Sequence, residues 1–65
     1  MMLFLDLVSN IKRVGTKLVI VYNDQEVYKG TFSSFKNWVH KNMYVSKFVD
    51  CIYTDENMLI VQLED

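Results

Sequence analysis

The sequence predicts a small α+β domain of four strands and two short helices, and three observations support this prediction. Apolar residues recur at three- and four-residue steps in two segments, as they do on amphipathic helices. β-Branched and aromatic residues gather in four other short segments, as they do in strands. The segments follow the order α-β-β-α-β-β with only short turns between them. We therefore expect residues 1–65 to form one domain, in which two hairpins make a four-stranded, mostly antiparallel sheet with two helices packed on it.

The first helix is predicted over residues 2–14. Lys12 and Arg13 would lie in its last turn, where they complement the helix dipole. Gly15 follows at the position where a left-handed capping residue is favoured. The apolar stripe of this helix would consist of Leu3, Phe4, Leu7, Val8, Ile11 and Val14.

The first hairpin is predicted directly after this helix. Lys17–Tyr22 is a nearly unbroken run of β-branched, aromatic and other apolar residues, which is typical of a strand. Asn23-Asp24-Gln25 would form the turn, and Glu26–Phe32 would return as the second strand.

The second helix is predicted to start at a serine cap, Ser33 or Ser34, and to run through about Met43. Its apolar stripe would consist of Phe35, Trp38, Val39 and Met43. Its solvent-exposed side would carry Lys36, Asn37, His40 and Lys41. At this spacing, Phe35 and Trp38 are interpreted as core residues rather than as platforms on which nucleic-acid bases stack.

The second hairpin is predicted from Val45–Thr54 and Met58–Leu63, joined by the three-residue loop Asp55-Glu56-Asn57. A three-residue loop is favoured because it sorts the apolar side chains onto one face. The cross-strand pairs would be Tyr53 with Leu59, Cys51 with Val61, and Val49 with Leu63.

The opposite face of this hairpin would carry a second apolar group, made of Phe48, Ile52, Met58 and Ile60. If both helices pack on one face of the sheet, this group is exposed and marks a protein interface. If the helices cover opposite faces, the group is part of the core. We favour the interface, because a chain of this length encloses little volume.

The charged residues are sorted along the chain. All seven basic residues lie between positions 12 and 47, where only Asp24 and Glu26 oppose them, so this stretch carries +5. Residues 48–65 contain five acidic residues and no Lys or Arg, and carry −5, although the whole chain carries only −1. The folded protein should therefore have a positive and a negative side, which favours oriented binding to a partner.

No group of residues in the sequence favours an enzyme, a metal site or a bound cofactor. His40 and Cys51 are the only candidates for a nucleophile–base pair, but one is expected on an exposed helix face and the other within a strand. Cys51 is expected to be a buried and unreactive thiol. The acidic pairs Asp55-Glu56 and Glu64-Asp65 lie in a turn and at the chain end, where they are not expected to converge. We expect no small-molecule substrate.

Nucleic-acid binding is the alternative function. Lys36, His40 and Lys41 would lie together on the exposed face of the second helix, where they could contact phosphates. The pI of about 5.7 and the single Arg count against this alternative.

The sequence thus predicts a small, non-enzymatic binding protein that acts through protein–protein contact, either as a homodimer or as an inhibitor or adaptor of another protein. The lone cysteine fits a reducing cytoplasm, and neither a signal peptide nor a membrane anchor is expected from the sequence. The lack of Ala and Pro and the single Arg indicate an AT-rich gene, such as that of a low-GC bacterium or its phage or plasmid.

Overall fold

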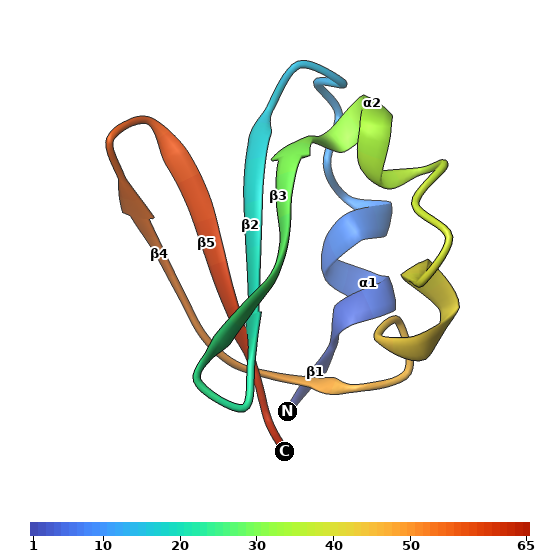
Figure 1. Cartoon of the computed structure of the whole chain (residues 1–65), viewed down its shortest axis with the longest axis vertical. Coiled ribbons are helices and arrows are strands. Elements are labelled where there is room, and N and C mark those ends of the chain that lie inside the picture. Colours follow the sequence, from blue (N-terminus) through green and yellow to red (C-terminus); the bar gives the residue numbers. More distant parts are fainter.

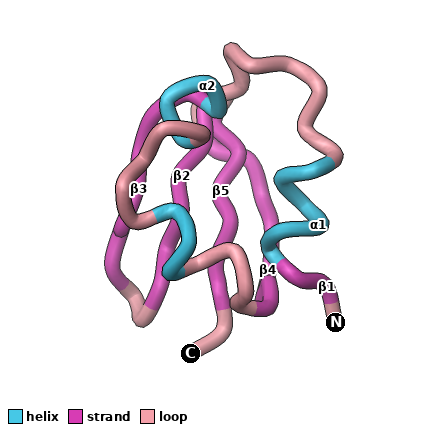
Figure 2. Tube along the Cα trace, turned by 90° about the vertical axis from the view of Figure 1, so that its right-hand side faces the viewer, coloured by secondary structure: helices cyan, strands magenta, loops and turns pink.

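A computed structural model describes all residues, 1–65, and shows a five-stranded sheet with the helices on one side of it (Figures 1 and 2). The strands are β1 (Met2–Leu3), β2 (Lys17–Tyr22), β3 (Gln25–Thr31), β4 (Phe48–Asp55) and β5 (Met58–Leu63). The helical elements are α1 (Phe4–Ser9), α2 (Phe32–Phe35) and a single 3-10 turn, η1 (Lys41–Met43). The sheet order is β1-β4-β5-β2-β3.

The α+β class and both hairpins are confirmed, but the predicted sheet of four strands is one strand short. Residues 2–3, predicted as helix, form β1 instead and pair antiparallel with Phe48 and Val49 of β4. The two hairpins are joined by β2 and β5, which pair in parallel from Leu18↔Leu59 to Tyr22↔Leu63. The sheet is therefore mixed, with one parallel contact at its centre.

The first helix is much shorter than predicted, because polar side chains at its end compete for its carbonyl groups. The Ser9 hydroxyl donates to the Leu5 carbonyl at 2.7 Å, and the Asn10 amide donates to the Asp6 carbonyl at 2.8 Å. Such bonds to the carbonyl four residues back satisfy the last turn without continuing the helix. Gly15 does not adopt a left-handed conformation, so its predicted capping role is wrong.

The second predicted helix breaks after Phe35, because aromatic packing outweighs local helix propensity. The Trp38 and Tyr44 rings stack with centroids 5.3 Å apart and planes 7° apart, and the two residues are six positions apart in the sequence. A regular helix would turn these two rings to different sides. The segment instead proceeds through tight turns, and Val39, predicted on the apolar stripe, is 84% exposed. The N-cap is Thr31, whose hydroxyl oxygen accepts from the Ser34 amide, rather than a serine.

Both hairpins have two-residue turns, and this corrects the predicted register of the second hairpin. Asn23-Asp24 and Glu56-Asn57 all have positive φ, as a type I′ turn requires. In the second hairpin, Tyr53 therefore pairs with Ile60, and Ile52 pairs with Val61. An irregularity between Val49 and Cys51 then restores the pairing of Val49 with Leu63, which was predicted.

The main core lies between the sheet and the helical layer. It contains buried residues from α1, α2, β2 and β5, namely Phe4, Val8, Phe32, Phe35, Leu18, Ile20, Val61 and Leu63. Because residues of both helices belong to this one cluster, the helices cover the same face of the sheet. Figure 2 shows this face toward the viewer, with the helices and the segment that follows α2 lying in front of the strands.

Candidate interaction surface

The opposite face of the sheet has no helix on it, and we call it the open face. In Figure 1 it lies to the left of the strands, while the helices lie to the right. Cross-strand pairing and alternation along β2, β4 and β5 define its central members. These are Val19, Val21, Cys51, Tyr53, Met58, Ile60 and Gln62.

Two residues of the open face are buried although no helix covers them. Val19 is 4% exposed and Ile60 is 8% exposed, and the two are direct neighbours across the parallel β2–β5 contact. Neither belongs to the main core cluster. Their burial comes from side chains of the same sheet, so they form a small apolar centre on this face. Around it, Val21 and Met58 are partly buried and Tyr53 is 46% exposed.

Polar side chains bridge the hairpin next to this apolar centre. The Cys51 thiol donates to Gln62 Oε1 at 3.3 Å, and Gln62 Nε2 donates to the Tyr53 hydroxyl at 3.4 Å. The prediction that Cys51 is buried is wrong, because the two-residue turn moves it from the core side to the open face, where it is exposed.

Charged residues flank the apolar centre at one level of the sheet. Lys17 of β2 and Asp55 of β4 lie on either side of Met58, because Asp55 pairs with Met58 and the β2–β5 register sets Lys17 beside it. Lys29 of β3 pairs with Val19 and adds a second positive charge on the same side as Lys17. A depression next to Met58 is lined by both lysines. At this level the open face is therefore positive toward β3 and negative toward β4, whereas Glu26 of β3, which pairs with Val21, adds a negative charge further along the face.

The four residues predicted as a protein interface do not share a face. Met58 and Ile60 lie on the open face, and Ile60 is buried there. Ile52 pairs with the core residue Val61, so its side chain lies on the helix side of the sheet, beyond the helices, and is 40% exposed. Phe48 is exposed at the lower end of β4, opposite Leu3 of β1.

The basic residues considered for nucleic acid are not presented on a regular helix. Lys41 Nζ donates to the Lys36 carbonyl at 3.2 Å, and Lys36 Nζ lies 5.0 Å from the centroid of the Phe32 ring. The His40 ring packs edge-on against Trp38 at 5.9 Å. Lys36 and Lys41 line one groove, but His40 does not line it. The nucleic-acid role of these residues stays a prediction.

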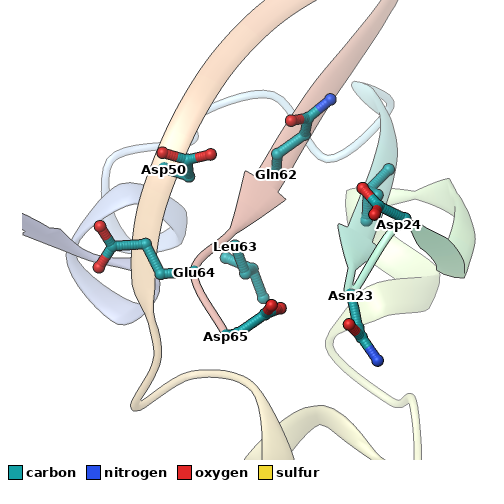
Figure 3. A pocket seen from close by; sticks show the side chains of 8 residues that line it. Asn23, Asp24, Asp50, Gln62, Leu63, Glu64 and Asp65 are labelled. Carbon is teal, nitrogen blue, oxygen red and sulfur yellow. The ribbon is translucent and has the colours of Figure 1, made fainter.

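An acidic depression lies at the end of the sheet where the chain terminates (Figure 3). Its carboxylates come from Asp24, Asp50, Glu64 and Asp65. In Figure 3 they are spread around the rim and do not point toward one centre. No three His, Cys, Asp or Glu side chains of the protein gather as they would around a metal ion.

The sequence analysis missed Val19, Val21 and Tyr53 as members of the open face. The signal was present in Leu18–Tyr22, which is apolar at every position. A strand of this kind is apolar on both of its faces, so one set of its side chains must meet something other than the helical layer.

Comparison with protein families, with curated proteins and with solved structures finds no match to this chain. None of its helices has the length and apolar character needed to cross a membrane.

Proposed function

We propose that this chain is a non-enzymatic protein-binding protein that acts through the open face of its sheet, with a second copy of itself as the partner. The observation that carries this proposal is that both helices pack on one face, which leaves an apolar centre with β-branched and aromatic side chains on the other. Val19 and Ile60 are themselves buried in the single chain, so the apolar surface available for association comes from Tyr53, Val21 and Met58 around them.

Charge complementarity supports a second copy as the partner. A twofold axis parallel to β5 and β2 would lay β3 of one copy over β4 of the other, at the same height along the strands. Lys17 and Lys29 of each copy would then approach Asp55 of the other. The chain has a surface of 4515 Å², and a standard interface of about 800 Å² per partner would cover less than a fifth of it.

The mass in solution, measured by sedimentation from dilute to concentrated samples, tests this proposal. We expect a monomer that becomes a dimer as the concentration rises. Tyr53→Lys should keep the fold and abolish the dimer, since Tyr53 is half-exposed on the open face. Val39→Lys is the matched control, because Val39 is exposed on the helical side and its replacement should leave the dimer intact.

A charge exchange gives a second test of the same arrangement. Lys17→Glu should weaken the dimer by bringing like charges together, and adding Asp55→Lys should restore it in part, since Lys29 would then face a like charge. Wild-type protein that remains a monomer at every concentration would contradict self-association. A dimer that survives Tyr53→Lys would contradict the open face as its interface.

A further inference from the structure

The outer edge of β4 is a strand edge without a partner over most of its length. β1 pairs only with Phe48 and Val49, at one end of β4. Figure 1 shows the rest of β4 as the outermost strand, with nothing drawn beyond it. Cys51, Ile52, Tyr53 and Thr54 are all exposed.

The turn geometry determines which backbone groups point outward along this edge. In a two-residue hairpin the residues next to the turn, here Asp55 and Met58, form a hydrogen-bonded pair, and pairs then alternate along the strands. Tyr53 therefore bonds inward to β5, whereas the amide and carbonyl groups of Ile52 and Thr54 point outward. None of the backbone hydrogen bonds outside the regular elements involves Ile52 or Thr54.

The acidic residues near the two ends of the free β4 edge determine which kind of strand can pair with it. Asp50 lies at one end of the free segment, and Asp55 and Glu56 lie at the other, with no basic residue between positions 48 and 65. In an antiparallel pairing of two copies that joins Ile52 to Thr54, Asp50 of each copy would meet Glu56 of the other. Like charges directly opposite each other disfavour this pairing. An extended segment with Lys or Arg at both ends would meet opposite charges instead.

We propose that the β4 edge accepts an extended segment of another protein, as an added strand, with basic residues about six positions apart and β-branched or aromatic residues between them. The added strand would bond to the outward groups of Ile52 and Thr54. Its side chains would lie beside the exposed side chains of Ile52 and Tyr53. This inference rests on the chain being a protein-binding protein, but it uses the backbone edge of β4 rather than the open face, which Tyr53 and Asp55 border.

A synthetic peptide tests the inference directly. The probe is a seven-residue peptide of alternating valine and threonine with a lysine at each end, titrated into isotopically labelled protein and followed by NMR. We expect saturable shifts of the Ile52 and Thr54 amides, with a Kd of about 1 mM or below, that weaken as salt is added. The same peptide ended by glutamates should not bind.

Two variants separate edge pairing from other binding. Thr54→Pro removes an outward amide that β5 does not use, so the fold should persist and peptide affinity should fall by about tenfold or more. Thr54→Val keeps the amide and should bind like the wild type. If Thr54→Pro does not fold, a lysine-ended peptide with its edge-facing amides N-methylated gives the same test without changing the protein.

Each outcome separates the two proposals. Absence of saturable shifts at Ile52 and Thr54, equal binding of the glutamate-ended peptide, or undiminished binding of the N-methylated peptide would overturn the edge inference. The dimer that is lost in Tyr53→Lys should persist in Thr54→Pro. If that dimer is found while the peptide fails to bind, the edge inference alone is wrong. If the peptide binds a protein that is monomeric at every concentration, the self-association proposal alone is wrong.

Discussion

On the helix side of the sheet, Phe35 is 1% exposed and has four aromatic neighbours, whereas on the open face Tyr53 is 46% exposed and its only side-chain hydrogen bond comes from Gln62. Both residues are large aromatics in a chain of only 65 residues. The difference shows that the two faces of this sheet are packed differently. The helix side supplies the stability of the domain, and we assign binding to the other side.

Aromatic contacts dominate the helix side. Trp38 packs on the core and lies against Tyr28, with ring centroids 4.9 Å apart, as well as against Tyr44. Backbone bonds from Phe4 to Lys47 and from Leu5 to Val45 fix the start of the chain to the end of the irregular segment. These contacts hold residues 36–47 in place without a regular helix.

The largest difference between the faces should follow from truncating one aromatic on each. Phe35→Ala should lower the free energy of unfolding by about 3–5 kcal/mol, which is close to the whole stability of a domain this small. Tyr53→Ala, the control on the open face, should change it by about 0.5 kcal/mol or less. Urea unfolding followed by circular dichroism measures both, and equal losses would mean that the open face is also core.

A smaller loss of stability is expected from replacing Gly30, because the Tyr28 ring lies close to the place that a side chain at residue 30 would occupy. A Cβ atom at this position would lie 2.8 Å from the Tyr28 hydroxyl. Gly30→Ala should therefore cost about 1–3 kcal/mol through overpacking. Combining it with Tyr28→Phe removes the clashing oxygen and should recover part of the loss in urea unfolding. A double variant no more stable than Gly30→Ala would show that the ring is not the cause.

The stability of the protein at alkaline pH should also depend on the Tyr28 side chain. Burial raises the pKa of the Tyr28 phenol above 10.0, and the nearby Ser34 side chain opposes this rise. The phenol also donates to the Thr31 carbonyl at 2.8 Å. The folded state holds the phenol proton more tightly than the unfolded state does. The stability that comes from this difference is complete below pH 10.0 and is lost as the pH rises through the raised pKa.

Thermal unfolding measured at increasing alkaline pH tests this effect. The wild type should lose more stability there than Tyr28→Phe does, since all other titrating groups are common to both. An identical pH dependence in the two proteins would contradict the role assigned to Tyr28.

The last prediction concerns the rate at which a thiol reagent labels Cys51. This rate measures the exposure of the thiol and involves no change in the stability of the fold. As an exposed residue of the open face, Cys51 should react with a thiol reagent in the native protein at a rate similar to that in denaturant. Dilute, monomeric protein is required, because the proposed dimer would cover this face. Slow labelling of the dilute native protein would contradict the register of the second hairpin.

The strands were predictable from the sequence because their composition is decisive. Lys17–Tyr22 and Met58–Leu63 have the predicted bounds, since short, nearly unbroken apolar runs next to turn residues leave little alternative. The register of the second hairpin was not predictable from apolar alternation. β5 is central and apolar at nearly every position, so alternation carries little information. The pairing follows from the two-residue turn at Glu56-Asn57, and this turn was not predictable because neither residue is Gly and both adopt positive φ.

The helices were less predictable, because tertiary contacts override their local pattern. The spacing of Trp38, Val39 and Met43 fits a helix, yet stacking of Trp38 on Tyr44 gives an irregular segment. This ring stacking between residues six positions apart does not follow from a helical period. The sequence favoured a sheet with one face free of helices, but the residues of that face depend on the register and were therefore assigned incorrectly for Ile52 and Cys51.

The concentration dependence of solvent access to the open face tests the central claim most directly. A soluble paramagnetic agent broadens NMR signals of methyl groups that it can reach, and Val21 and Met58 on the open face can be compared with Leu18 and Ile20 in the core. We expect the Val21 and Met58 methyls to be broadened in dilute protein and protected in concentrated protein, while those of Leu18 and Ile20 stay protected throughout. Val21 and Met58 methyls that are equally accessible at every concentration would contradict the claim that this face binds a second copy.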